Sequence, residues 1–72
     1  MNLTKKEKLL ALSSALHLVG IELEASRETL EEMHEQGMPL NSGETVEASG
    51  RFSRLALRFI QLEEEYLKLV KG

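Results

Sequence analysis

The stretch "EQGMPLNSGE", residues 35–44, decides the fold of this 72-residue chain. Gly37 suits the left-handed conformation that ends a helix, and Pro39 follows two residues later, where it blocks continuation of that helix. Asn41 is expected to cap the next helix, with Glu44 three residues on as the reciprocal half of a capping box. The stretch therefore predicts the end of one helix, a short turn and the start of another.

Helical patterns lie on both sides of this turn, without any strand pattern or internal repeat. Thr4 and Glu7 form a second capping pair, which opens the first helix. We expect helices over about 5–36 and 43–71, joined by a turn over 37–42. At about 1.5 Å per residue the two helices are closely matched in length. The whole chain is thus predicted to form one all-α domain, a two-helix antiparallel hairpin.

Each predicted helix carries an apolar stripe whose residues alternate steps of three and four, the spacing of a coiled-coil seam. In the first helix the stripe comprises Leu9, Leu12, Leu16, Val19, Leu23, Ser26, Leu30 and Met33. In the second helix it comprises Ala48, Phe52, Leu55, Phe59, Leu62, Tyr66 and Leu69. We expect these two stripes to face each other and close the hairpin.

Both helices have further apolar residues outside the seam. They are Leu10, Leu18, Ile21 and Ala25 in the first helix, and Val46, Ala56, Ile60, Leu67 and Val70 in the second. A lone hairpin covers one stripe per helix. At about 25 cal/mol per Å² of apolar area, leaving the other apolar residues in water would lose several kcal/mol of possible stabilisation. We therefore expect a homodimer that forms a four-helix bundle. The alternative is that this flank docks on a different protein.

Composition and charge narrow the classes of function. The chain has no cysteine, which excludes disulfides and cysteine-ligated zinc. His17 and His34 are its two histidines, and His34 has only Glu31 beside it as a second ligand, so we predict no metal site and no other cofactor. The net charge of −3 argues against binding to nucleic acid or to an acidic membrane.

Targeting signals are not apparent either. No uninterrupted apolar run approaches the roughly 18 residues of a membrane span. The start "MNLTKKEK" lacks the apolar segment of a signal peptide. We expect a cytoplasmic protein.

Charge is sorted along the predicted rod. Lysines gather at the open end, where the two termini meet: Lys5, Lys6, Lys8, Lys68 and Lys71. Glutamates gather near the turn: Glu28, Glu31, Glu32, Glu35, Glu44 and Glu47. This separation favours solubility and the registration of antiparallel helices, and it also offers two electrostatically distinct ends to partners.

Three arginines share one face of the second helix, because Arg51, Arg54 and Arg58 are spaced by three and four. One interpretation is that they form salt bridges to glutamates of the first helix. The other is a guanidinium strip able to grip carboxylates or a phosphoryl group. Small side chains in the same part of the helix would let another helix approach closely: Ser49, Gly50, Ser53 and Ala56.

The arrangement of four stretches resembles a known family. They are "IELEASRETLEEM" (21–33), "EQG" (35–37), "ETVEASGRFSRL" (44–55) and "FIQLEEEYLKL" (59–69). The layout is similar to that of the small sporulation-regulating aspartyl-phosphate phosphatases of the stage-zero E type, found in spore-forming bacteria. Members of that family are helical hairpins that bind a phosphorylated response regulator and promote loss of its aspartyl phosphate.

The family carries a signature close to Ser-Gln-Glu-Leu-Asp in its second helix, and here Ser53 stands in place of the functional acid. The resemblance implies a regulatory protein that binds a response regulator and whose only enzymatic activity would be that of an aspartyl-phosphate phosphatase. Because the acid is replaced, we expect slow or no turnover and assign no catalytic residue. The alternative function is a non-catalytic, Rop-like homodimeric hairpin. The partner-binding residues implied are Ser49, Gly50, Arg51, Phe52, Ser53 and Arg54.

Overall fold

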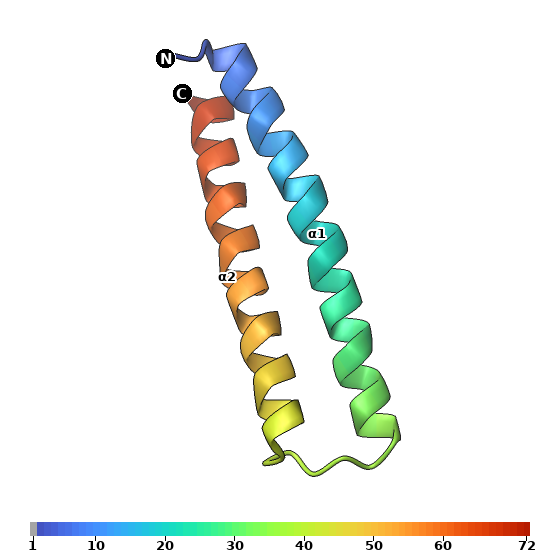
Figure 1. The fold of residues 1–72 in the computed structure, drawn as a ribbon. Coiled ribbons are helices and arrows are strands. Elements are labelled where there is room, and N and C mark those ends of the chain that lie inside the picture. Colours follow the sequence, from blue (N-terminus) through green and yellow to red (C-terminus); the bar gives the residue numbers. More distant parts are fainter. Residues whose placement is uncertain (1) are drawn as a thin grey trace.

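Two α-helices make up nearly all of the computed structural model, which describes residues 2–72. They are α1 (Lys5–Glu35) and α2 (Gly43–Lys71), and they lie antiparallel, side by side (Figure 1). Both termini lie at one end of a rod that measures 49 × 23 × 16 Å. The predicted all-α helical hairpin is confirmed.

The start of α1 is held by the predicted capping box. The Thr4 hydroxyl accepts a hydrogen bond from the Glu7 N–H at 3.1 Å, and the Glu7 carboxylate accepts one from the Thr4 N–H at 3.0 Å. These bonds satisfy amides that have no partner within the helix. The Thr4 backbone N–H, and after it the Thr4 hydroxyl, lower the pKa of the Glu7 carboxyl.

The end of α1 is closed by Gly37, whose φ of 73° is the predicted left-handed conformation. Its N–H donates to the His34 carbonyl at 3.0 Å, and the Met38 N–H donates to the Met33 carbonyl at 3.1 Å. This pair of bonds is a Schellman motif. It ends the helix at Glu35, before Pro39 is reached, so local chemistry alone accounts for the reversal of the chain.

The cap of α2 lies one residue later than predicted. Ser42, and not Asn41, is the capping residue: its hydroxyl accepts from the Thr45 N–H at 3.2 Å and lies 2.8 Å from the Thr45 hydroxyl. The prediction of Asn41 was therefore wrong. Asparagine and serine are comparably good caps, and the two stand side by side in the sequence. The bond to Ser42 also gives the buried Thr45 hydroxyl a partner.

The two predicted seams face each other along the rod. Every residue of both stripes is buried or half-buried. Within residues 2–72, Leu62 is the one buried apolar side chain, with 3% of its surface exposed, and no large side chain is fully buried. At mid-rod Gly20 lies against the Phe59 ring, 3.6 Å from where a Cβ at Gly20 would stand. A single layer of two helices has nothing to cover its flanks, so the core is thin.

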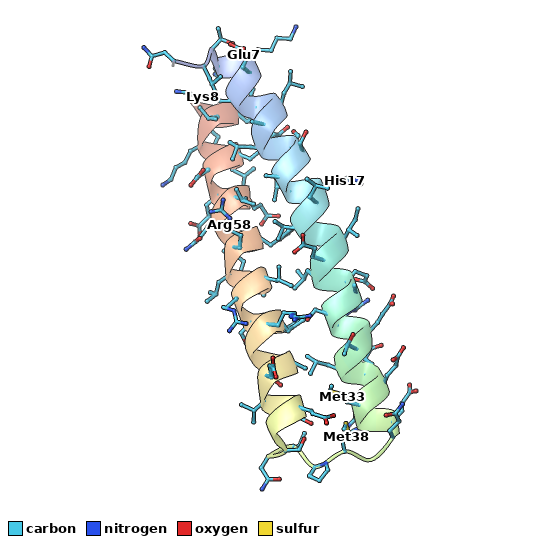
Figure 2. The ribbon with its side chains drawn as sticks, viewed as in Figure 1. Glu7, Lys8, His17, Met33, Met38 and Arg58 are labelled. Atoms are coloured by element: carbon cyan, nitrogen blue, oxygen red, sulfur yellow. The ribbon has the colours of Figure 1, made fainter. Side chains whose placement is uncertain are left out.

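The apolar residues outside the seam are exposed, apart from the half-buried Ala15, Met38 and Ala56. Figure 2 shows side chains projecting from both helices away from the space between them. In α1 the exposed apolar residues include Leu10, Leu18, Ile21 and Ala25, and in α2 they include Val46, Leu57, Ile60, Leu67 and Val70. The hairpin alone therefore leaves a large apolar surface in water.

Helix α1 is long enough and apolar enough to meet the criterion for a membrane span, partly because its outward face carries apolar residues. Its apolar 18-residue window has a mean hydropathy of 1.3, and 6% of that window is buried. The sequence-based expectation considered uninterrupted runs, whereas a window average tolerates interruptions such as Ser13, Ser14 and His17. Core helices of soluble proteins meet the same criterion, and here it marks apolar side chains that face outward.

The burial pattern predicts very different costs for two leucines. Leu62→Ala removes the most buried apolar side chain of the seam and should lower the free energy of unfolding by about 2–5 kcal/mol. Leu18→Ala, at a position 61% exposed on the outer face of α1, should change it by less than about 0.5 kcal/mol. Urea unfolding followed by circular dichroism, at equal protein concentrations, measures both. Similar losses would show that the assigned seam is wrong.

Candidate functional site

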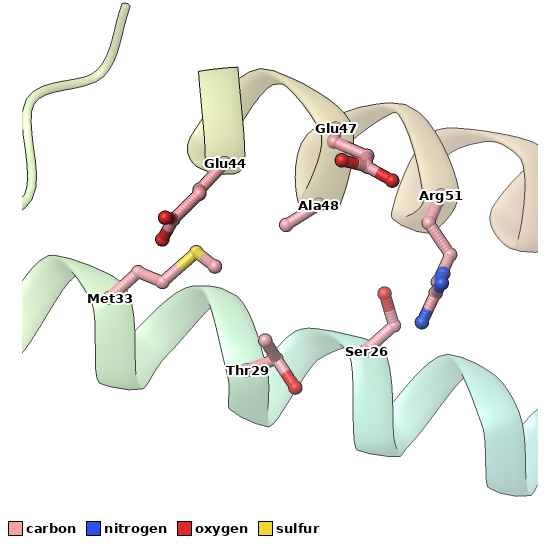
Figure 3. A pocket seen from close by; sticks show the side chains of 7 residues that line it. All are labelled: Ser26, Thr29, Met33, Glu44, Glu47, Ala48 and Arg51. Atoms are coloured by element: carbon pink, nitrogen blue, oxygen red, sulfur yellow. The ribbon is translucent and has the colours of Figure 1, made fainter. Parts of the chain in front are cut away.

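A groove lies between α1 and α2 in the half of the rod nearer the turn. It consists of two neighbouring pockets of about 240 and 460 Å³, which share Ser26, Thr29 and Arg51. Figure 3 shows the smaller pocket, with Ser26 and Arg51 together at one end and Met33 and Glu44 at the other. The smaller pocket is completed by Met33, Glu44, Glu47 and Ala48, and the larger by Glu22, Ala25, Arg54 and Leu55.

The groove exists because the side chains of the seam are smaller in this half of the rod. Ser26 in α1 and Ala48 in α2 occupy seam positions that carry larger side chains elsewhere in the hairpin. In Figure 3 their side chains stop well short of the opposite helix. The sequence placed both residues in the seam but missed the groove. A layer-by-layer comparison of side-chain sizes places the small residues of both helices in the same stretch only once the shift of one helix along the other is known.

Two guanidinium groups line this groove without a carboxylate partner. In residues 2–72 the one ion pair joins Arg27 to Glu24, within α1, and the bond to Glu24 raises the pKa of Arg27. Neither Arg51 nor Arg54 is paired, nor is Arg58. The interpretation that these arginines bridge to glutamates of the first helix is therefore wrong. The interpretation as an open guanidinium strip is retained.

The two pockets differ in charge. Two arginines and one carboxylate, Glu22, line the larger pocket, whereas Arg51 stands against two carboxylates, Glu44 and Glu47, in the smaller one. The larger pocket therefore has a surplus of positive charge. The Thr29 hydroxyl beside it donates to the Ala25 carbonyl at 3.1 Å. Guanidinium groups form strong, directional bonds to carboxylate and phosphoryl oxygens, so the larger pocket suits an anionic group.

The predicted partner-binding residues divide between different sides of α2. Arg51 and Arg54 line the groove, and Phe52 is half-buried in the seam. Ser49 and Ser53 are exposed and line neither pocket of the groove. Successive residues of a helix are rotated by about 100°, so consecutive residues cannot share one surface.

Gly50 lies between these two sides. It is half-buried, and the Arg54 guanidinium lies 3.4 Å from where a Cβ at Gly50 would stand. A Cβ there would be in ordinary van der Waals contact with Arg54, whose side chain folds back over Gly50. The stretch that resembles the phosphatase signature supplies an arginine surface and, separately, a surface of small side chains.

The described part of the chain holds no group of three or more His, Cys, Asp or Glu residues that could bind a metal ion. His17 and His34 are both exposed. The larger pocket with its two arginines is consequently the candidate site.

Comparison of the chain with protein-family models, with curated proteins and with solved structures gives no match. The resemblance to the sporulation phosphatases rests on the stretches of sequence quoted above.

Filling the groove at Ser26 with a larger apolar side chain should raise the stability of the hairpin and close the groove. Ser26→Leu should extend the seam into the groove and raise the melting temperature by about 4–8 °C, which corresponds to about 1 kcal/mol of added burial. Ser14→Leu makes the same change at an exposed position of α1 and controls for helix propensity. Thermal unfolding by circular dichroism measures both. A lower melting temperature for Ser26→Leu would mean that the seam is already fully packed there.

Proposed function

We propose that this protein is a small regulatory hairpin that acts by binding another protein, and that the partner is a phosphorylated response regulator. The supporting observation is the groove in which Arg51 and Arg54 stand without a carboxylate partner within residues 2–72. These arginines would contact the acidic phosphorylation site of the regulator. The resemblance to the sporulation phosphatases supports the choice of partner.

The charge of the larger pocket supports an anionic partner independently of that resemblance. Arg51 and Arg54 are three residues apart, so both guanidinium groups project from one side of α2. Together they can donate two pairs of hydrogen bonds, one to a phosphoryl group and one to a neighbouring carboxylate. Glu22 is the one carboxylate that opposes them in the larger pocket. Charge attraction of this kind sets the association rate and the choice of partner.

Binding without rapid turnover is the expected mode of action. Hydrolysis of an aspartyl phosphate moves the phosphoryl group to water and leaves a carboxylate and inorganic phosphate. In the family this reaction is associated with the acid that Ser53 replaces. Ser53 is exposed and lies outside the groove. We place the protein in the cytoplasm with its proposed partner and assign it no cofactor.

A second candidate function is that of a non-catalytic homodimer with Rop-like architecture. The observation that favours it is the thin core, in which Leu62 is the one buried apolar side chain of the described residues while many others stay exposed. Pairing two hairpins into a four-helix bundle would remove that surface from water. The hairpin would then serve as an interaction or structural module.

Arg51→Glu should weaken binding to a phosphorylated regulator at least about tenfold at low salt, because it reverses a charge in the groove. The difference should shrink as salt screens the charges. The measurement is fluorescence anisotropy with receiver domains of response regulators, phosphorylated with acetyl phosphate. Arg27→Glu is the matched control, since it changes the net charge equally at an arginine outside the groove.

Equal weakening by Arg51→Glu and Arg27→Glu would show that net charge, and not the groove, attracts the regulator. Failure to bind any phosphorylated receiver domain would remove this proposal in favour of the homodimeric module.

Turnover is tested separately. The unmodified chain should release inorganic phosphate from a phosphorylated receiver domain slowly or not at all, because Ser53 is not an acid. Ser53→Asp restores the family's carboxyl group, but on a side of α2 outside the groove, so release should stay slow if the phosphoryl group binds at Arg51 and Arg54. Phosphate release during incubation with each chain gives the two rates. Rapid release by the unmodified chain would show that the acid lies elsewhere in the sequence.

A further inference from the structure

A second face of α2 combines exposed apolar side chains with small ones. Following steps of three and four along the helix, it carries Val46, Ser49, Ser53, Ala56, Ile60, Glu63, Leu67 and Val70. Its four large apolar residues are 47–59% exposed. None of the eight residues lines the arginine groove. We call this surface the small-residue face.

We propose that the small-residue face binds the same face of a second copy of the chain, with the two α2 helices antiparallel. The proposal rests on the self-association considered as the second candidate function. It is independent of regulator binding, because the arginine groove lies on another side of α2.

The sizes of the side chains favour the antiparallel direction. With a two-fold axis beside position 58, Leu67 lies opposite Ser49 of the partner subunit. By the same symmetry Ile60 lies opposite Ala56 of the partner subunit. Position 58 is midway along the sequence between the members of each pair, so one axis relates both. In these two pairs a large side chain meets a small one, as close packing requires, and the same axis sets Val46 opposite Val70 of the partner subunit.

A parallel dimer would pair each residue of this face with its own copy. The two Glu63 carboxylates would then face each other and repel, and Ser49 would leave a gap against Ser49 of the partner subunit. The antiparallel direction instead sets Glu63 opposite Ser53 of the partner subunit, where the hydroxyl can donate to the carboxylate.

The distribution of charge along the rod favours the same direction. Lysines lie at the open end and glutamates at the turn, and within residues 2–72 none of these lysines forms an ion pair inside its own hairpin. In an antiparallel dimer, Lys68 and Lys71 would lie near Glu44 and Glu47 of the partner subunit. A parallel dimer would instead set lysines against lysines and glutamates against glutamates.

The size of the face is sufficient for a dimer of modest affinity. A strip one helix wide, about 10 Å, along the 49 Å rod has a flat area on the order of 500 Å² per copy. Two copies would bury about 1,000 Å² or more, near the lower limit for a specific interface. The 72-residue chain also needs burial beyond its thin core to be stable.

Disulfide cross-linking tests the direction, and the chain offers a clean background because it has no cysteine. Ser49→Cys and Leu67→Cys chains are made separately, then mixed and oxidised. We expect the mixed disulfide to dominate, with little cross-linking of either chain alone, because a disulfide requires Cα atoms within about 7 Å. Efficient cross-linking of the Ser49→Cys chain with itself would show a parallel dimer and overturn the proposal.

Sedimentation equilibrium tests whether the small-residue face forms the dimer interface. Ile60→Glu should convert the dimer to a folded monomer, whereas Leu18→Glu, the same change at an exposed position of α1, should leave the dimer intact. The opposite result would move the interface to α1 and overturn the proposal. If the unmodified chain is a monomer with a melting temperature independent of concentration, self-association itself is overturned, whatever the outcome with the regulator.

Discussion

Two helices can bury only the stripe that each turns toward the other, and the other properties of this protein depend on that constraint. Leu62 alone among the described apolar side chains is buried, and its apolar neighbours in the seam are half-buried. Caps at Thr4, Gly37 and Ser42 fix where the helices begin and end. These caps determine the shape of the hairpin but bury no additional apolar surface. Any molecule that covers an exposed face would therefore add a large share of the total stability.

The same constraint explains how a binding groove arises in so small a protein. In a thicker fold, other elements would fill the space beside Ser26 and Ala48, but here that space stays open to solvent. Arg51 and Arg54 remain hydrated at its edge, and exposed ion pairs would have added little stability. Leaving the arginines unpaired thus costs the fold little and keeps their hydrogen-bonding capacity for a partner.

The local parts of this fold could be predicted from the sequence because each depends on neighbouring residues. The stripe containing Leu62 follows from heptad spacing, the capping box from Thr4 and Glu7, and the end of α1 from Gly37. The cap at Ser42 was missed because Asn41 beside it has an equal propensity. The error is of one residue, within the usual scatter of helix ends.

The groove could not be predicted in the same way, because it depends on how far one helix is shifted along the other. That shift decides whether the small residues Ser26 and Ala48 fall in the same stretch of the hairpin and whether Arg51 can reach a carboxylate of α1. Both properties depend on residues that are far apart in the sequence. The predicted partner-binding residues are adjacent in sequence, yet Ser53 and Arg54 belong to different sides of α2, which depends on the helix and not on adjacency.

The separation of these two sides bears on how the two proposed activities would combine. A copy bound through the small-residue face would leave Arg51 and Arg54 accessible on the other side of α2. The groove lies in the half of the hairpin near the turn, and an antiparallel dimer puts the two turns at opposite ends. Each end would then present one groove, far from the other. Self-association and regulator binding would not compete for surface, and dimerisation would stabilise the thin core that holds each groove open.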